Sequence, residues 1–194
     1  DSCPRDYDVY FADVDLDGVG DVCDPLWQVT PNRGGNAGQV TVELHGDDIQ
    51  LDAAARLTRA GLSDGVASMV HSAQDGKSAT ATFDLQSAAT GLWDVIVDSG
   101  DSSATLPAAF TVLAGGQGSL SVDIQGSSAL LRGWEVAYTI AYWNSGTVDI
   151  ISPILSLTAS GGATLKLPND TEYRDTIRLF AAGNRSGGVL PPGV

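Results

Sequence analysis

A chain of 194 residues is long enough for one or two domains, and 43% hydrophobic against 18% charged residues excludes a disordered chain. The net charge of −14 argues against nucleic acid as a partner, and no apolar run approaches the ~20 residues of a membrane span, so we expect no membrane insertion. Of the 24 acids all but Glu43, Glu135 and Glu172 are aspartates, which favour turns over helices. Composition therefore predicts an all-β protein.

Half of the net charge lies in the first 25 residues, where eight aspartates face Arg5 alone. Within them DVDLDGVGDVCD places acids at positions 1, 3, 5, 9 and 12 of a twelve-residue loop, with Gly18 at position 6. Six to eight oxygens in this order suit Ca²⁺, and the alternative is a solvated acidic turn. The expected ligands are Asp13, Asp15, Asp17, the carbonyl of Val19, Asp21 and Asp24.

Cys3 and Cys23 are the only cysteines, one at each end of the acidic segment. This placement favours a local disulfide and hence an oxidising, extracytoplasmic compartment, with free thiols or metal ligands as the alternative. No basic and apolar leader opens the chain, so we expect a mature fragment whose targeting signal lay upstream.

Pro25 directly after the loop and Gly20 within it do not fit the flanking helices of an EF-hand. Cys3-Pro4, a spacer and DVDLDGVGDVCD instead resemble a thrombospondin type 3 repeat over about residues 1–25, although the spacer Asp8 to Phe11 departs from that family. The resemblance implies little regular secondary structure over 1–27, the calcium ligands named above and a Cys3–Cys23 disulfide. A second ion at Asp6 or Asp8 stays open.

Period-two apolar alternation begins after Val29 and recurs between turn-like GDD, SDG and SGDSS stretches, which predicts a β-sandwich over residues 28–114. Leu51 to Arg59 alone has a helical period and predicts a short helical turn. The VTP opening with Gly34-Gly35 and the GLWDVIVDSGDSSATLPAAFTVL close are similar to the immunoglobulin-like IPT/TIG family over residues 28–113. That resemblance implies a spacer or binding module.

The GGQG of residues 115–118 reads as a linker, and a second Ig-like sandwich is expected over residues 118–194. WEVAYTIAYWNSGTVD resembles the strand-turn-strand of bacterial surface Ig-like repeats. The ending LPPGV looks like the entry into another strand, so we expect a piece of a longer protein, and whether the last domain is complete stays open. Strands are expected at Leu120 to Ile124, Trp134 to Tyr142, Ile154 to Leu157 and Thr164 to Leu167.

Catalytic signatures are weak, because His45 and His71 stand isolated and no nucleophile or metal-hydrolase motif appears. Asp47-Asp48 and Asp98 with Asp101 offer carboxylate pairs, but they lie in turns where aspartate is common. We therefore expect no enzyme. The sequence favours a calcium-stabilised structural or adhesive segment of a large secreted or cell-surface bacterial protein, whose partners are neighbouring domains, another surface protein or a glycan.

Two alternatives to that function remain. One is an accessory, carbohydrate-binding domain of a secreted polysaccharide-degrading enzyme, which would need two of Trp27, Trp93, Trp134 and Trp143 on one exposed face. The other is calcium-triggered self-cleavage at Asp24-Pro25.

Overall fold

The fold was analysed in a computed structural model, which describes residues 12–16, 18–21, 23–127, 131, 133–181 and 188–193. All regular structure in these ranges is β, which confirms the all-β class. Among the described residues none belongs to a helix long and apolar enough to cross a membrane. The described part of residues 12–27 forms turns and bends without a strand.

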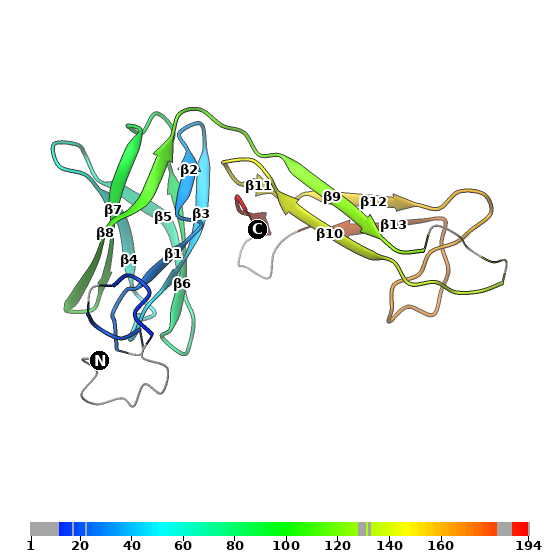
Figure 1. The fold of residues 1–194 in the computed structure, drawn as a ribbon, viewed down its shortest axis with the longest axis horizontal. Coiled ribbons are helices and arrows are strands. Elements are labelled where there is room, and N and C mark those ends of the chain that lie inside the picture. Colours follow the sequence, from blue (N-terminus) through cyan, green and yellow to red (C-terminus); the bar gives the residue numbers. More distant parts are fainter. Residues whose placement is uncertain are drawn as a thin grey trace.

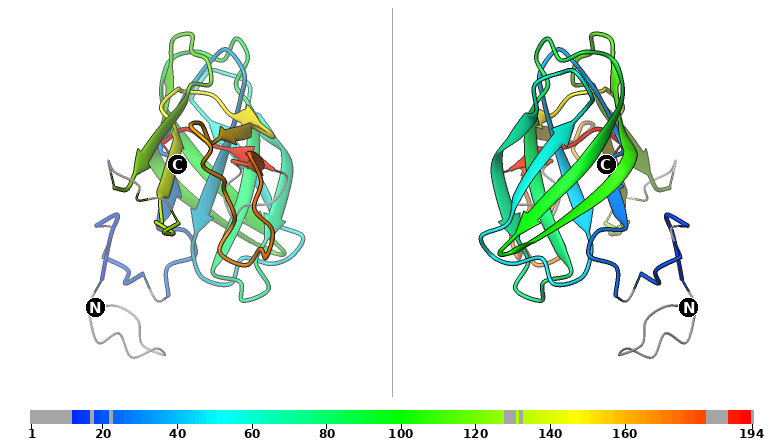
Figure 2. Two further views of the ribbon diagram at one scale, coloured as in Figure 1. Left: turned by 90° about the vertical axis from the view of Figure 1, so that its right-hand side faces the viewer. Right: turned by 90° about the vertical axis from the view of Figure 1, so that its left-hand side faces the viewer.

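A first unit is built from eight strands in two layers joined by the β4–β5 pair (Figures 1 and 2). One layer has the order β1-β3-β6-β5 and the other β4-β7-β8-β2, antiparallel except for the parallel β2–β8 pair. The chain changes layers between β1 and β2, at the cis peptide bond before Pro31. The strands are β1 Gln28–Thr30, β2 Arg33–Gly35, β3 Gln39–His45, β4 Ala54–Thr58, β5 Gly65–Ser72, β6 Ser78–Asp84, β7 Gly91–Ser99 and β8 Ser102–Leu113.

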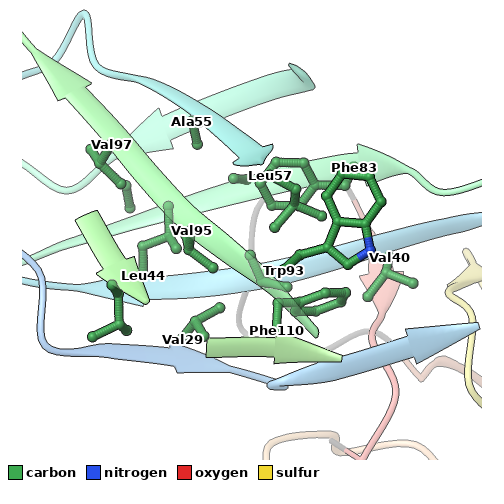
Figure 3. Close-up of a cluster of buried hydrophobic side chains, with 14 of the residues drawn as sticks. Val29, Val40, Leu44, Ala55, Leu57, Phe83, Trp93, Val95, Val97 and Phe110 are labelled. Carbon is green, nitrogen blue, oxygen red and sulfur yellow. The ribbon is translucent and has the colours of Figure 1, made fainter. Parts of the chain in front are cut away.

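The core of this unit lies between the two layers, where alternate residues of each strand point inward (Figure 3). Each fully buried Val, Leu or Phe side chain stabilises the fold by about 1.5–3 kcal/mol. Trp93 is buried here, and its indole Nε1 donates to the carbonyl of Ala89 at 2.9 Å. The period-two pattern thus marks the inward residues, among them Val40, Val42, Leu44, Ala81, Phe83, Trp93, Val95, Val97, Phe110 and Val112.

The helical turn predicted for Leu51 to Arg59 is wrong, because Ala54–Thr58 forms strand β4. β4 pairs antiparallel with β7 from Ala54 opposite Asp98 to Thr58 opposite Asp94. Ala55 and Leu57 point into the core. Pairing with β7 and burial of two alternate side chains outweigh the weak local period.

A second unit follows the linker and consists of two-stranded sheets (Figure 1). β9 pairs with β10, β12 with β13, and β11 with β14, all antiparallel. The strand predicted from Trp134 begins only at Thr139, and the predicted strand at Thr164 to Leu167 is reduced to a single bridge between Leu165 and Arg174. The strands are β9 Leu120–Gln125, β10 Thr139–Asn144, β11 Ile150–Ile151, β12 Ile154–Thr158, β13 Thr176–Phe180 and β14 Val189–Leu190.

The two units meet on β3. The Asp149 carboxylate accepts hydrogen bonds from the Thr41 backbone N–H at 2.9 Å and the Thr41 hydroxyl at 2.6 Å. The Asp149 N–H donates to the Gln39 carbonyl at 2.9 Å, and Val148 joins the core cluster of the first unit. Thr41, on the outward face of β3, is buried as a result. The second unit is therefore hydrogen-bonded to the middle of a sheet strand.

The Asn144 side chain hydrogen-bonds to four separate backbone groups of the second unit. Its side chain has no exposed surface, and its Nδ2 donates to the carbonyls of Val148 at 2.8 Å and Leu190 at 3.0 Å. Its Oδ1 accepts from the backbone N–H groups of Ser119 at 3.1 Å and Gly146 at 2.9 Å. One amide thus joins the linker end, the β10 turn and β14 with every donor and acceptor used.

We expect that lowering the pH raises the stability of the wild type relative to that of the Asp149→Asn variant. Burial raises the pKa of Asp149, opposed by the hydrogen bonds from Thr41. The folded state therefore holds the proton of the Asp149 carboxyl more tightly than the unfolded chain does. The stability that protonated Asp149 contributes is full below the ordinary pKa of about 3.9 and is lost as pH rises through the raised pKa. Urea unfolding from about pH 7 down to about pH 4 should show the wild type gaining on the variant. A difference independent of pH would contradict this, and Asp52→Asn on the surface is the control.

Asn144→Ala should destabilise the second unit by about 2–4 kcal/mol, because two N–H groups and two carbonyls lose buried partners. Amide exchange at Ser119 and Gly146 should speed up together. Asn169→Ala, at an exposed turn residue, should change stability by less than about 0.5 kcal/mol. Equal effects of the two substitutions would show that the Asn144 network does not hold the unit together.

Candidate metal centre

The acidic loop is closed by two of its own aspartates. The Asp21 backbone N–H donates to the Ala12 carbonyl at 2.9 Å, and the Asp21 Oδ1 accepts from the Val14 N–H at 2.9 Å. The Asp13 Oδ2 accepts from the Gly18 N–H at 3.1 Å. Gly18 has φ of +93°, a conformation that favours glycine at this turn. Positions 1 and 9 of the predicted loop therefore lie side by side.

Asp13 has the side-chain oxygen that best fits a cation ligand. Its second oxygen, Oδ1, is buried and receives no hydrogen bond from the part of the chain that the structure describes. A buried carboxylate oxygen without a donor is costly, and a hard cation satisfies it by direct coordination. Asp13 Oδ1 therefore fits a Ca²⁺ ligand.

The other expected ligands are only partly gathered. Asp15 and Val19 belong to the same closed loop and are half-buried, while Asp17 lies outside the described residues. Within the described ranges, no three acidic, histidine or cysteine side chains stand close enough together to hold a metal ion. Calcium in this loop would therefore have to draw further oxygens toward Asp13.

Asp24, at position 12, connects the loop to the first unit. It is only 4% exposed, its Oδ1 accepts from the Leu26 N–H at 3.0 Å, and its carbonyl accepts from the Asp47 N–H at 2.7 Å. Asp47 follows β3 by two residues. Gly46 lies so close to Pro25 that a Cβ on it would clash with the Pro25 carbonyl. This contact uses backbone groups and has no motif in the sequence.

Two further contacts continue the docking at the end of β3. The Trp27 N–H donates to the His45 carbonyl at 2.9 Å, and the Trp27 ring stacks on the His45 ring with centroids 5.4 Å apart. Leu26 is buried with the core of the first unit. His45 thus packs against an aromatic ring.

Cys23 is disulfide-bonded, and the described part of the chain holds no free cysteine. Cys3, its predicted partner, lies outside the described residues, so the pairing stays a prediction. The Cys23 N–H donates to the Gly20 carbonyl at 2.9 Å, which forms a turn between the loop and Asp24.

The carboxylates weighed as catalytic pairs have other partners. Asp47 pairs with Lys77, and the Asp98 carboxylate accepts from Arg56 Nε at 3.0 Å and from the Ser103 hydroxyl at 2.7 Å. The Arg56 hydrogen bond, aided by Ser103, lowers the pKa of Asp98 and keeps it ionised. His71 lies exposed on β5.

Of the tryptophans considered for sugar binding, Trp93 is in the core and Trp27 stacks on His45. Trp134 is 72% exposed and Trp143 also faces solvent, both in the second unit. Beside Trp134, Glu135 accepts hydrogen bonds from Tyr173 and from Lys166, and these two contacts lower its pKa in that order.

A scan against protein-family models gave no match to this chain, and a search of curated proteins found no relative. The resemblances to the thrombospondin type 3 repeat, the IPT/TIG family and bacterial surface Ig-like repeats therefore stay predictions.

Calorimetric titration of chelator-treated protein should show saturable binding of about one Ca²⁺ ion. Asp13→Asn should weaken that binding by about tenfold or more, because it removes a negative charge where an oxygen is already desolvated. Asp101→Asn, in the turn between β7 and β8, makes the same chemical change away from the loop and should bind as the wild type does. Equal affinity in the two variants would contradict the site.

Proposed function

We propose that this chain is a calcium-stabilised structural and adhesive segment of a large secreted or cell-surface bacterial protein. Asp24 carries the proposal, because this nearly buried residue is both the last expected ligand of the loop and the hydrogen-bond acceptor for Asp47. A cation that fixes Asp24 in the loop also fixes the loop against the first unit.

Strand β3 connects the acidic loop to the second unit. The acidic loop docks at the end of β3 through Trp27 and His45, and the second unit is hydrogen-bonded to its middle through Thr41 and Asp149. β3 itself lies between β1 and β6 inside a sheet. The loop and the second unit are therefore both attached to one internal strand. A segment that sets the angle between neighbouring modules needs such a common attachment.

The energy available from the ion is sufficient for such a role. Binding to the folded loop alone stabilises it by about 1.4 kcal/mol when calcium exceeds the dissociation constant tenfold. Extracellular calcium modules have dissociation constants of roughly 10⁻⁴ to 10⁻³ M, so the stabilisation is greatest in calcium-rich surroundings outside the cell. The acidic segment holds little apolar surface of its own, so this term counts for much of its stability.

Gly46→Ala disturbs the docking contact without changing an expected calcium ligand, because the added Cβ clashes with the Pro25 carbonyl. Calcium should raise the melting temperature of the first unit in the wild type. Melting is measured by near-ultraviolet circular dichroism, with buried Trp93 as the reporter. In Gly46→Ala this shift should be lost, and the affinity for calcium should fall by the factor that corresponds to the lost shift, because the coupling between ion binding and docking is reciprocal.

Gly65→Ala is the matched control, since its Cβ would meet Leu57 at an ordinary 3.7 Å. A calcium shift of equal size in wild type and Gly46→Ala would contradict the coupling of loop and first unit. Intact mass recorded on the same samples tests self-cleavage at Asp24-Pro25, since two fragments would favour that alternative.

A further inference from the structure

The second unit has an apolar face that its described residues leave partly uncovered. In the β9–β10 register Val122 lies opposite Tyr142 and Ile124 opposite Ile140, all on one face of the hairpin. Val122 is 43% and Ile124 56% exposed, while Ile140 and Tyr142 are half-buried. We call Val122, Ile124, Ile140 and Tyr142 the apolar stripe.

The hairpin of β12 and β13 also has exposed apolar side chains. β12 and β13 bury Leu155 and Ile177, yet their outer pair, Ile154 and Phe180, is exposed. Sheets two strands wide bury only a small part of each other, and exposed apolar faces of this extent mark interaction sites. Three of the four stripe residues are aliphatic, and aliphatic side chains suit a protein surface better than a sugar, which stacks on aromatic rings.

Charge distribution points to a second copy of this chain as the occupant. Residues 1–114 hold 18 acids and 5 bases, a net −13, whereas residues 115–194 hold 6 acids and 5 bases, a net −1. Two copies therefore repel each other through their N-terminal parts and approach without such repulsion only through their second units. The stripe face itself carries no charge, because β10 has no charged residue and Asp123, the one charged residue of β9, lies on the opposite face.

We propose that two copies pack their apolar stripes against each other about a two-fold axis. The second unit extends away from the acidic loop (Figure 1), so a tail-to-tail pair places the two −13 regions at opposite ends. Such a contact uses the same patch on both copies and closes on itself as a dimer.

Sedimentation equilibrium of the full chain, from about 1 μM to about 200 μM in calcium buffer, tests this. The wild type should pass from the mass of one chain to that of two. Val122→Lys with Ile124→Lys should remain monomeric, since four lysines would then meet at the contact. Both positions are exposed, so the fold should survive, which circular dichroism checks. Ile124→Thr, with a smaller change, should weaken the dimer at least about fivefold.

The control is Gln125→Lys with Ala141→Lys on the opposite face of the same hairpin, where Asp123 lies across from Ala141. It adds the same charge and should dimerise as the wild type does. A wild type that stays monomeric throughout, or a stripe variant that dimerises like the control, would overturn the proposal. Open-ended growth beyond two chains would overturn the two-fold contact.

Discussion

Mutual repulsion among the aspartates of residues 13–24 is the constraint on which the rest of this structure depends. Two carboxylates 4 Å apart repel by about 1 kcal/mol in water and about 4 kcal/mol near a protein surface. The loop offsets part of this with backbone N–H donors from Val14 and Gly18. The buried Asp13 Oδ1 receives no hydrogen bond from the described residues. A divalent cation would both reduce the repulsion between the carboxylates and coordinate this oxygen.

Strand β3 links the acidic segment to the rest of the structure. Because Asp24 is hydrogen-bonded beyond the end of β3 and Asp149 at its middle, the most acidic and the most neutral parts of the chain are fixed to one strand. The uneven charge then has two consequences. Under the proposed function it makes the N-terminal end dependent on calcium, and under the proposed dimer it leaves the second unit as the surface through which another copy approaches.

Local alternation predicted those strands whose inward residues are apolar, as in β3, β6 and β7. It failed where distant partners decide the structure: β4 is a strand because β7 pairs with it, and Trp134 to Tyr138 is not one because no further strand lies beside it in the described chain. The loop ligands stay a prediction from spacing, which rests on the order in which a calcium loop presents its oxygens. Contacts such as Asp24 to Asp47 and Thr41 to Asp149 join backbone groups or residues 108 positions apart, which no local pattern encodes.

The most direct test is amide exchange at Asp47, whose N–H donates to the Asp24 carbonyl. It should be measured in saturating calcium and again with a chelator, with an amide at the centre of β6 as internal reference. If calcium holds the loop on β3, the Asp47 amide will be protected with the ion and will exchange much faster without it, while the reference stays constant. Equal protection under both conditions would show that the loop docks without calcium.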